Sequence, residues 1–189
     1  MKTTIVPQQT AFFTQHGYIE FEFDLTNILP LVSTQQRDLW RKNSVLKEFL
    51  IRKMGPIALA LSGKKQLRLA LDQGMHPEGM PKKATALKDL LSIQGLKIGL
   101  VIAENPVRAA KISPLGLSPL PTTSHHVLFF RPDILLDFPS ISSNLYFAFF
   151  CLPNAVYIHN KKDPLTNYLK DLGLNFGDVL KNETHPLLF

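Results

Sequence analysis

The chain has 189 residues, of which 45% are hydrophobic and 10% aromatic, and its formal net charge at pH 7 is +6. This length and composition exclude an intrinsically disordered chain and allow a sizeable core, so we expect a single domain spanning residues 1–189. The single cysteine, Cys151, excludes an internal disulfide framework and a cysteine-rich metal cluster, which favours a cytoplasmic protein with an inert core thiol.

The sequence predicts neither a signal peptide nor a membrane partner. Near the N-terminus, Pro7 and several polar residues interrupt the unbroken apolar run that a signal peptide needs. The most apolar stretch, residues 143–159, is interrupted by Pro153 and Asn154, so it does not read as a membrane helix.

The positive charge is scattered along the chain in single residues and pairs. Arg37 and Arg41 are four residues apart and would share one face of a helix, as charged residues do on many solvated helices. The sequence has no long basic block, aromatic RNA-binding motif or zinc-finger spacing. We therefore expect both arginines to point to solvent, and we expect no nucleic-acid partner.

The first elements in chain order are a helix and a strand. Residues 8–16 are predicted to form a helix that Gly17 ends as a C-terminal cap. Residues 18–23 alternate apolar and acidic side chains, which indicates a half-buried strand at the edge of a sheet.

A long helix is expected next, over residues 34–53. Trp40 and Phe49 belong to its apolar stripe and should face the core. The pair Gly55-Pro56 is expected to break this helix, and a short second helix should end at Gly63. The middle of the chain is then predicted as a strand (66–72), an irregular loop (73–83), one or two helical turns (85–91), a strand (93–103) and a long loop (105–124).

The stretch His126–Asn160 is the most apolar part of the sequence. It predicts three strands, Val127–Phe130, Leu145–Leu152 and Ala155–Ile158, and strands this apolar are typical of sheets buried on both faces. A helix over Asp163–Leu172, ended by Gly173, should follow. The expected core residues are Phe129, Leu136, Phe147, Phe149 and Val156.

Helices followed by short strands with proline-rich connections predict an α+β fold. The form we expect is a double-stranded β-helix (jelly roll) with the N-terminal helices packed on one sheet, because this closure hides sheet edges.

Three short motifs resemble the phytanoyl-CoA dioxygenase-like branch of the iron(II)/2-oxoglutarate oxygenases. The first is Phe12-Phe13 followed by Gly17-Tyr18-Ile19, which is similar to the helix–Gly-Tyr–strand opening of that branch. The second is the segment 127–136, similar to the strand and turn that deliver the second iron-binding His. The third is the ending, residues 173–178 and His185-Pro186.

The resemblance implies an iron site that this sequence does not keep intact. Such enzymes hold iron with two His and one carboxylate, and they use an Arg to bind the far carboxylate of 2-oxoglutarate. Alignment with the family places Leu136 at the second His, and the uncharged segment Tyr146–Ala148 at the Arg. We therefore expect no catalytic residues, no metal and no cofactor.

A relocated iron site is the alternative. His76-Pro77-Glu78 is the one His-x-acid motif in the chain, and His125 or His126 would have to supply the third ligand. Two functions therefore stay open. The first is a non-catalytic, oxygenase-like protein that binds a small molecule or a protein. The second is a divergent oxygenase that uses iron(II) and 2-oxoglutarate.

Overall fold

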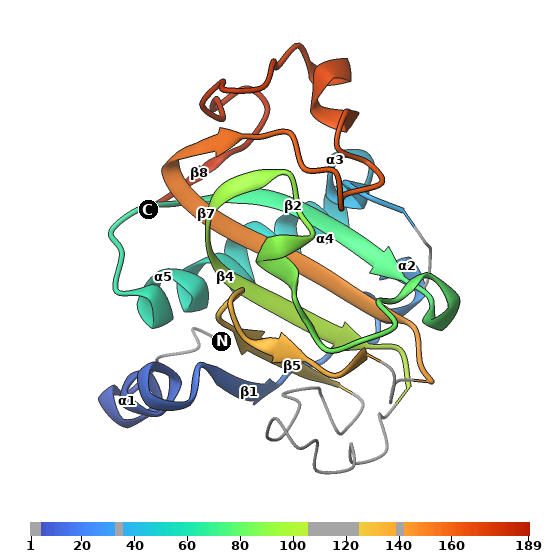
Figure 1. Ribbon diagram of the computed structural model, residues 1–189. Coiled ribbons are helices and arrows are strands. Elements are labelled where there is room, and N and C mark those ends of the chain that lie inside the picture. The colour runs from blue at the N-terminus through green and yellow to red at the C-terminus, as the bar shows by residue number, and fades with distance from the viewer. Residues whose placement is uncertain (1–4, 33–35, 106–124, 139–141) are drawn as a thin grey trace.

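The computed structural model describes residues 5–32, 36–105, 125–138 and 142–189 (Figure 1). Its strands are β1 (Tyr18–Glu22), β2 (Leu67–Met75), β3 (Thr85–Ala86), β4 (Ile93–Ala103), β5 (His126–Phe130), β6 (Leu135–Leu136), β7 (Leu145–Tyr157) and β8 (Leu187–Leu188). Its helices are α1 (Pro7–His16), α2 (Leu29–Val32), α3 (Leu39–Lys42), α4 (Ser44–Glu48), the π-helix η1 (Phe49–Met54), α5 (Gly55–Ser62) and the 3-10 helices η2 (Pro77–Gly79), η3 (Leu87–Asp89) and η5 (Tyr168–Leu172).

Six strands form one antiparallel sheet in the order β1-β5-β4-β7-β2-β8, and β3 pairs with β6 in a second, two-stranded sheet. Strand β1 lies at one edge of the large sheet, as its alternating sequence predicts. The helix that precedes it ends at Gly17, whose φ of +79° is the left-handed conformation expected of a C-terminal cap.

Strand β7 runs through the middle of the large sheet, between β4 and β2 (Figure 1). Its successive side chains belong to two different cores. Tyr146, Ala148 and Phe150 pack on one face of the sheet with side chains of the helices, and Phe147 and Phe149 pack on the other. We call the first the helix face and the second the inner face. The apolar run Leu145–Leu152 in β7 is thus explained by burial on both sides.

The predicted separation of Leu145–Leu152 and Ala155–Ile158 into two strands is wrong, because β7 continues through Pro153 and Asn154. Gln94 pairs with Val156 and Leu96 with Cys151, so Gly95 alone on β4 faces four residues of β7. This irregularity is a β-bulge. A proline is tolerated there because no N–H is needed at that position for a hydrogen bond between the strands.

The expected helix break at Gly55-Pro56 is also wrong. The helix widens into the π-helix η1 before these residues, and the Gly55 N–H donates to the Leu50 carbonyl. Pro56 then falls in the first turn of α5, where its missing N–H costs little. The segment ends at Gly63, as predicted, with a φ of +63°.

The helices cover the helix face of the sheet, where Trp40 and Phe49 are buried as predicted. On the inner face lie the small β3–β6 sheet and segments from the C-terminal third of the chain (Figure 1). The core on this face includes Met80 and Leu87, from before and after β3, and Leu136, Phe138, Leu169 and Leu174 from the C-terminal third. The structure is therefore a mixed α and β fold with helices packed on one sheet, as expected.

Several boundaries differ from the prediction. Residues 85–91 form the short strand β3 and the 3-10 helix η3, and the expected helix 163–172 is a series of turns that ends in η5. Val156 is only half-buried because it sits beside the bulge. Most of the loop predicted at 105–124 lies outside the described residues. Among the residues described, none of the helices has the length and hydropathy to cross a membrane.

Candidate functional site

Leu136, the position at which the resemblance implies an iron ligand, lies on β6 and is fully buried. It pairs with Thr85 of β3 and belongs to the apolar core of the inner face. Phe130, Phe147 and Phe149 fill the same core and meet edge to face or stacked, with ring centroids 6.0 to 6.4 Å apart. The interior that an iron site would occupy is filled here by leucine and phenylalanine side chains.

His76 and Glu78 come directly after β2, and neither is fully buried. His76 is half-buried with an extended backbone, and Glu78 is exposed on the 3-10 helix η2. The i, i+2 spacing predicts two extended side chains on one side of the chain. The helical turn at Pro77–Gly79 instead leaves the Glu78 carboxylate facing solvent.

His125 and His126 lie at the start of β5 and have other partners. His125 has a left-handed backbone with a φ of +63°, and its Nδ1 accepts a hydrogen bond from the Leu25 N–H at 3.3 Å. The His126 Nδ1 lies 3.3 Å from a carboxylate oxygen of Glu20 on the neighbouring edge strand. These partners, Leu25 and Glu20, belong to β1 and the segment after it, so neither interaction directs a histidine ring toward β2.

The structure does not bring the four candidate ligands together. Met75, Leu145 and Ala103 pair across β2, β7 and β4, and β5 is the next strand in the sheet. His76 and His126 are therefore separated by three strand spacings, about 14 Å. Every His, Cys, Asp and Glu of the sequence lies in the described ranges, and within those ranges no three of them are placed to hold a metal ion. The side chains present do not form a facial triad.

Arg37, expected in solvent, is buried on the inner face. Its side chain is 5% exposed and its Nη1 donates to the Asp163 carboxylate at 3.0 Å. Its Nε and Nη2 both donate to the Gln73 amide oxygen, at 3.0 and 2.6 Å, and its guanidinium lies over the Tyr168 ring. The solvated-face prediction is wrong because Arg37 lies in an extended segment that pairs with β2, not in a helix.

Arg41, also expected in solvent, is only partly exposed. Its guanidinium lies 4.2 Å from the centre of the Trp40 ring and its Nε donates to the Asp38 carboxylate at 2.6 Å. Both arginines thus form an ion pair with a carboxylate and pack over an aromatic ring.

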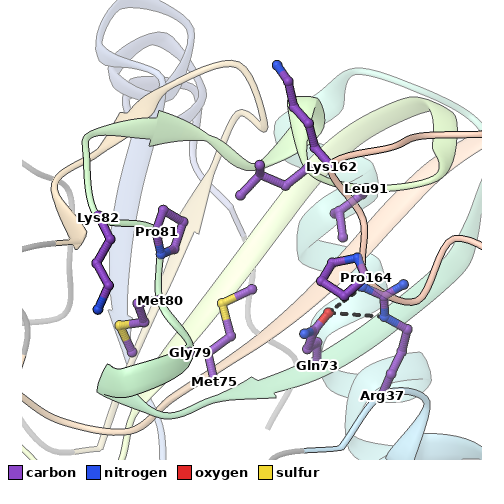
Figure 2. Close-up of a pocket in the computed structure, with 11 residues that line it drawn as sticks. Arg37, Gln73, Met75, Gly79, Met80, Pro81, Lys82, Leu91, Lys162 and Pro164 are labelled. Atoms are coloured by element: carbon purple, nitrogen blue, oxygen red, sulfur yellow. Dashed lines mark hydrogen bonds between the residues drawn. The ribbon is translucent and has the colours of Figure 1, made fainter.

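A pocket of about 310 Å³ opens beside Arg37 on the inner face (Figure 2). Gln73 and Met75 of β2 form one wall, and the opposite walls come from residues on both sides of the η3 turn and from the segment after β7. The complete lining is Arg37, Gln73, Met75, Gly79, Met80, Pro81, Lys82, Leu90, Leu91, Lys162 and Pro164. Of the four sequence-derived candidates, none lines it, although His76 directly follows Met75.

The helix face contains a buried acid that the sequence does not single out. Asp72 of β2 is fully buried, and one of its oxygens accepts hydrogen bonds from the Trp40 N–H at 2.9 Å and the Tyr146 hydroxyl at 2.6 Å. Its other oxygen has no hydrogen-bond partner among the described residues. Burial, together with the neighbouring Asp38 carboxylate, raises the pKa of Asp72 to about 7.

A buried histidine lies close to the same network. His185 accepts a hydrogen bond at its Nε2 from Arg41 at 3.1 Å, which requires a neutral ring. Burial and the adjacent charges of Arg41 and Arg68 lower the pKa of His185 to about 3.

Comparisons with known proteins give the fold that this architecture shares with solved structures. No protein-family model and no curated protein matches the sequence. Among solved structures, the alpha ketoglutarate dependent carbocyclase SnoK from nogalamycin biosynthesis is similar with a TM-score of 0.70 and 14% identity, over 98% of this chain and 97% of that chain. The chain shares the fold of this enzyme. The epimerase SnoN of the same biosynthesis also has a TM-score of 0.70, with 13% identity over 96% of this chain and 97% of that chain. CytC3 with Fe(II) and alpha-ketoglutarate has a TM-score of 0.56, with 10% identity over 83% and 81%.

These similarities correct the expectation that no cofactor belongs to this protein. SnoN is known in complex with Fe³⁺ and alpha ketoglutarate, and CytC3 with Fe(II) and alpha-ketoglutarate, which is another name for 2-oxoglutarate. The expectation of no cofactor is therefore contradicted by proteins that share this fold, although the side chains of this chain do not form the facial triad.

Proposed function

We propose that this protein is a divergent iron(II)/2-oxoglutarate-dependent oxygenase of the phytanoyl-CoA dioxygenase-like branch, with a double-stranded β-helix as its framework. The observation that supports the proposal is the similarity of nearly the whole chain, 98%, to an alpha ketoglutarate dependent enzyme. We also propose that residues 1–189 act as one domain in the cytoplasm, without a nucleic-acid partner.

His76 and Glu78 are the residues to test as iron ligands. They follow β2 at the place where the resemblance implies the first two ligands, and they are the one His-x-acid pair in the sequence. The hydrogen bonds and ion pairs among the described residues include neither side chain, so both are available to a metal. A bound iron would supply the oxygen chemistry of the reaction.

The test is anaerobic addition of iron(II) and 2-oxoglutarate to the purified protein. We expect a visible charge-transfer absorption band and a calorimetric binding signal that depends on both components, and we expect His76→Ala to abolish them. His16→Ala is the matched control, because His16 is exposed on α1, away from β2. A wild-type protein that gives neither band nor heat would rule out the proposed oxygenase.

The second candidate is a protein that binds a small molecule without oxidising it. The observation that favours it is the complete burial of Leu136 at the position of the second iron ligand. In that case the Leu136→His variant would gain no iron affinity, whereas a small-molecule ligand would still raise the thermal midpoint of the wild-type protein.

A further inference from the structure

The pocket beside Arg37 combines an apolar lining with positive charge. Met75, Met80, Leu90 and Leu91 supply apolar surface, whereas the charged lining residues are all cations and no acidic side chain lines the pocket among the described residues. Its volume of about 310 Å³ lies at the lower end of the usual range for small-ligand sites.

Arg37 forms a rigid donor in the wall of this pocket. Asp163, which is 2% exposed, is itself held by the N–H groups of Ser92 and Leu165, each at 3.0 Å. Together with Gln73 and Tyr168, it fixes the guanidinium plane, so an incoming anion need not order a flexible side chain.

Two of the five N–H hydrogens of Arg37 are left over. Three of them are used, one from Nε and one from each terminal nitrogen, on Gln73 and Asp163. The remaining two have no acceptor among the residues that the structure describes. A buried guanidinium with spare donors is suited to a carboxylate oxygen, because hydrogen bonds between charged groups are stronger than those between neutral groups.

Two lysines add positive charge to the lining of the pocket. The side chain of Arg37 is neutralised by Asp163, but none of the ion pairs between described residues includes Lys82 or Lys162. Figure 2 shows these two lysines on different sides of the pocket, which Met75 and Met80 also line. Their combined field favours a negatively charged ligand.

We propose that this pocket binds an organic monocarboxylate with an apolar chain. The carboxylate accepts the spare N–H groups of Arg37, Lys82 and Lys162 attract it at the rim, and the chain lies against Met75, Met80 and Leu91. The site does not depend on iron, so its assay is carried out in EDTA, where failure of the oxygenase proposal cannot affect the result.

The probe is octanoate, followed by NMR of protein labelled with ¹³C at the methionine methyl groups. The chain has four methionines, so the spectrum is simple. Met75 and Met80 should shift with a common saturation curve, and Met54, which is buried in the core of the helix face, should not. Octanol lacks the charge and acetate lacks the chain, so each should bind about tenfold or more weakly than octanoate.

A pair of charge-reversal variants separates this site from general attraction to a basic protein. Lys82→Glu with Lys162→Glu should weaken octanoate about tenfold or more. The neighbouring pair Lys83→Glu with Lys161→Glu changes the net charge equally at exposed positions that do not line the pocket, and should leave affinity unchanged. Octanol binding as tightly as octanoate, equal losses in both double variants, or a shift of Met54 alone would each overturn the proposal.

Discussion

Replacing Asp72 by Asn should change how the stability of the protein depends on pH. Asn keeps an oxygen that can accept from Trp40 and Tyr146, and it removes a buried charge. The pKa of Asp72 is raised from 3.8 to about 7, so the folded state binds more protons than the unfolded state between about pH 4 and pH 7. The wild-type protein therefore loses stability from this group as the pH rises through that range.

The size of the effect follows from the shift. At about 1.4 kcal/mol per pKa unit, a rise of about three units corresponds to an upper limit of about 4 kcal/mol above pH 7. Relaxation around the buried charge makes the measured value smaller. Asp72→Asn should thus be more stable than wild type at pH 8, because the amide can also donate to the unpaired Asp38 oxygen nearby.

His185 has the opposite effect on how the stability of the protein depends on pH. Its pKa falls from 6.5 to about 3, so the unfolded state binds more protons between about pH 3 and pH 6.5, and stability from this group rises with pH in that window. In the wild-type protein, the contributions of Asp72 and His185 to the pH dependence of stability therefore oppose each other. Stability should rise with pH in Asp72→Asn and fall with pH in His185→Gln.

The assay is urea unfolding followed by the fluorescence of Trp40, the single tryptophan, at several pH values between 4 and 8. Asp171→Asn, which removes an exposed carboxylate from η5, is the control. Its unfolding free energy should change with pH in the same way as that of the wild-type protein. If the unfolding free energy of Asp72→Asn changes with pH as it does in the wild-type protein, or if the variant is less stable at pH 8, the assignment of a destabilising buried charge to Asp72 is incorrect.

Three further predictions concern the inner face. Leu136→Ala should lower the unfolding free energy by about 2–5 kcal/mol in urea titrations, because it opens a cavity in the core. Leu135 is 47% exposed, so Leu135→Ala should change the unfolding free energy by about 0.5 kcal/mol or less. Equal losses in the two variants would contradict the burial of Leu136. Gly99→Ala would place a Cβ 2.4 Å from the Phe130 ring and should cost about 1–3 kcal/mol, with a smaller loss when Phe130→Leu is made as well. Cys151 is fully buried, and burial raises the pKa of its thiol to about 12, so a thiol reagent at pH 8 should modify it in urea and not in the folded protein.

Features that depend on neighbouring residues were predictable from the sequence. Glycines 17, 63 and 173 end their helical segments in the left-handed conformation, which a local chain break can specify. The strand 93–103 has the predicted bounds, and the alternation in β1 marks an edge strand. Leu136 is buried in the core, as its place in an apolar stretch indicates.

Features that depend on distant partners were not predictable. Pro153 reads as a turn unless Gly95, some sixty residues earlier, is known to face it across a bulge. Arg37 reads as a solvated charge because Asp163, its partner, lies 126 residues further along the chain. The pocket beside Arg37 could not be predicted for the same reason, since its lining comes from five separate segments.

The strand order has a consequence for how the protein is made. Neighbouring strands come from distant parts of the sequence, since Tyr18 pairs with Phe130 and Arg68 with Cys151. Even β4 and β5, which are consecutive, are separated by residues 104–125. Such long-range pairing slows folding. On the ribosome, β2 and β4 must wait for β7 to emerge before either gains its central neighbour, so the nascent chain carries unpaired apolar strands during much of its synthesis and offers a binding site to chaperones.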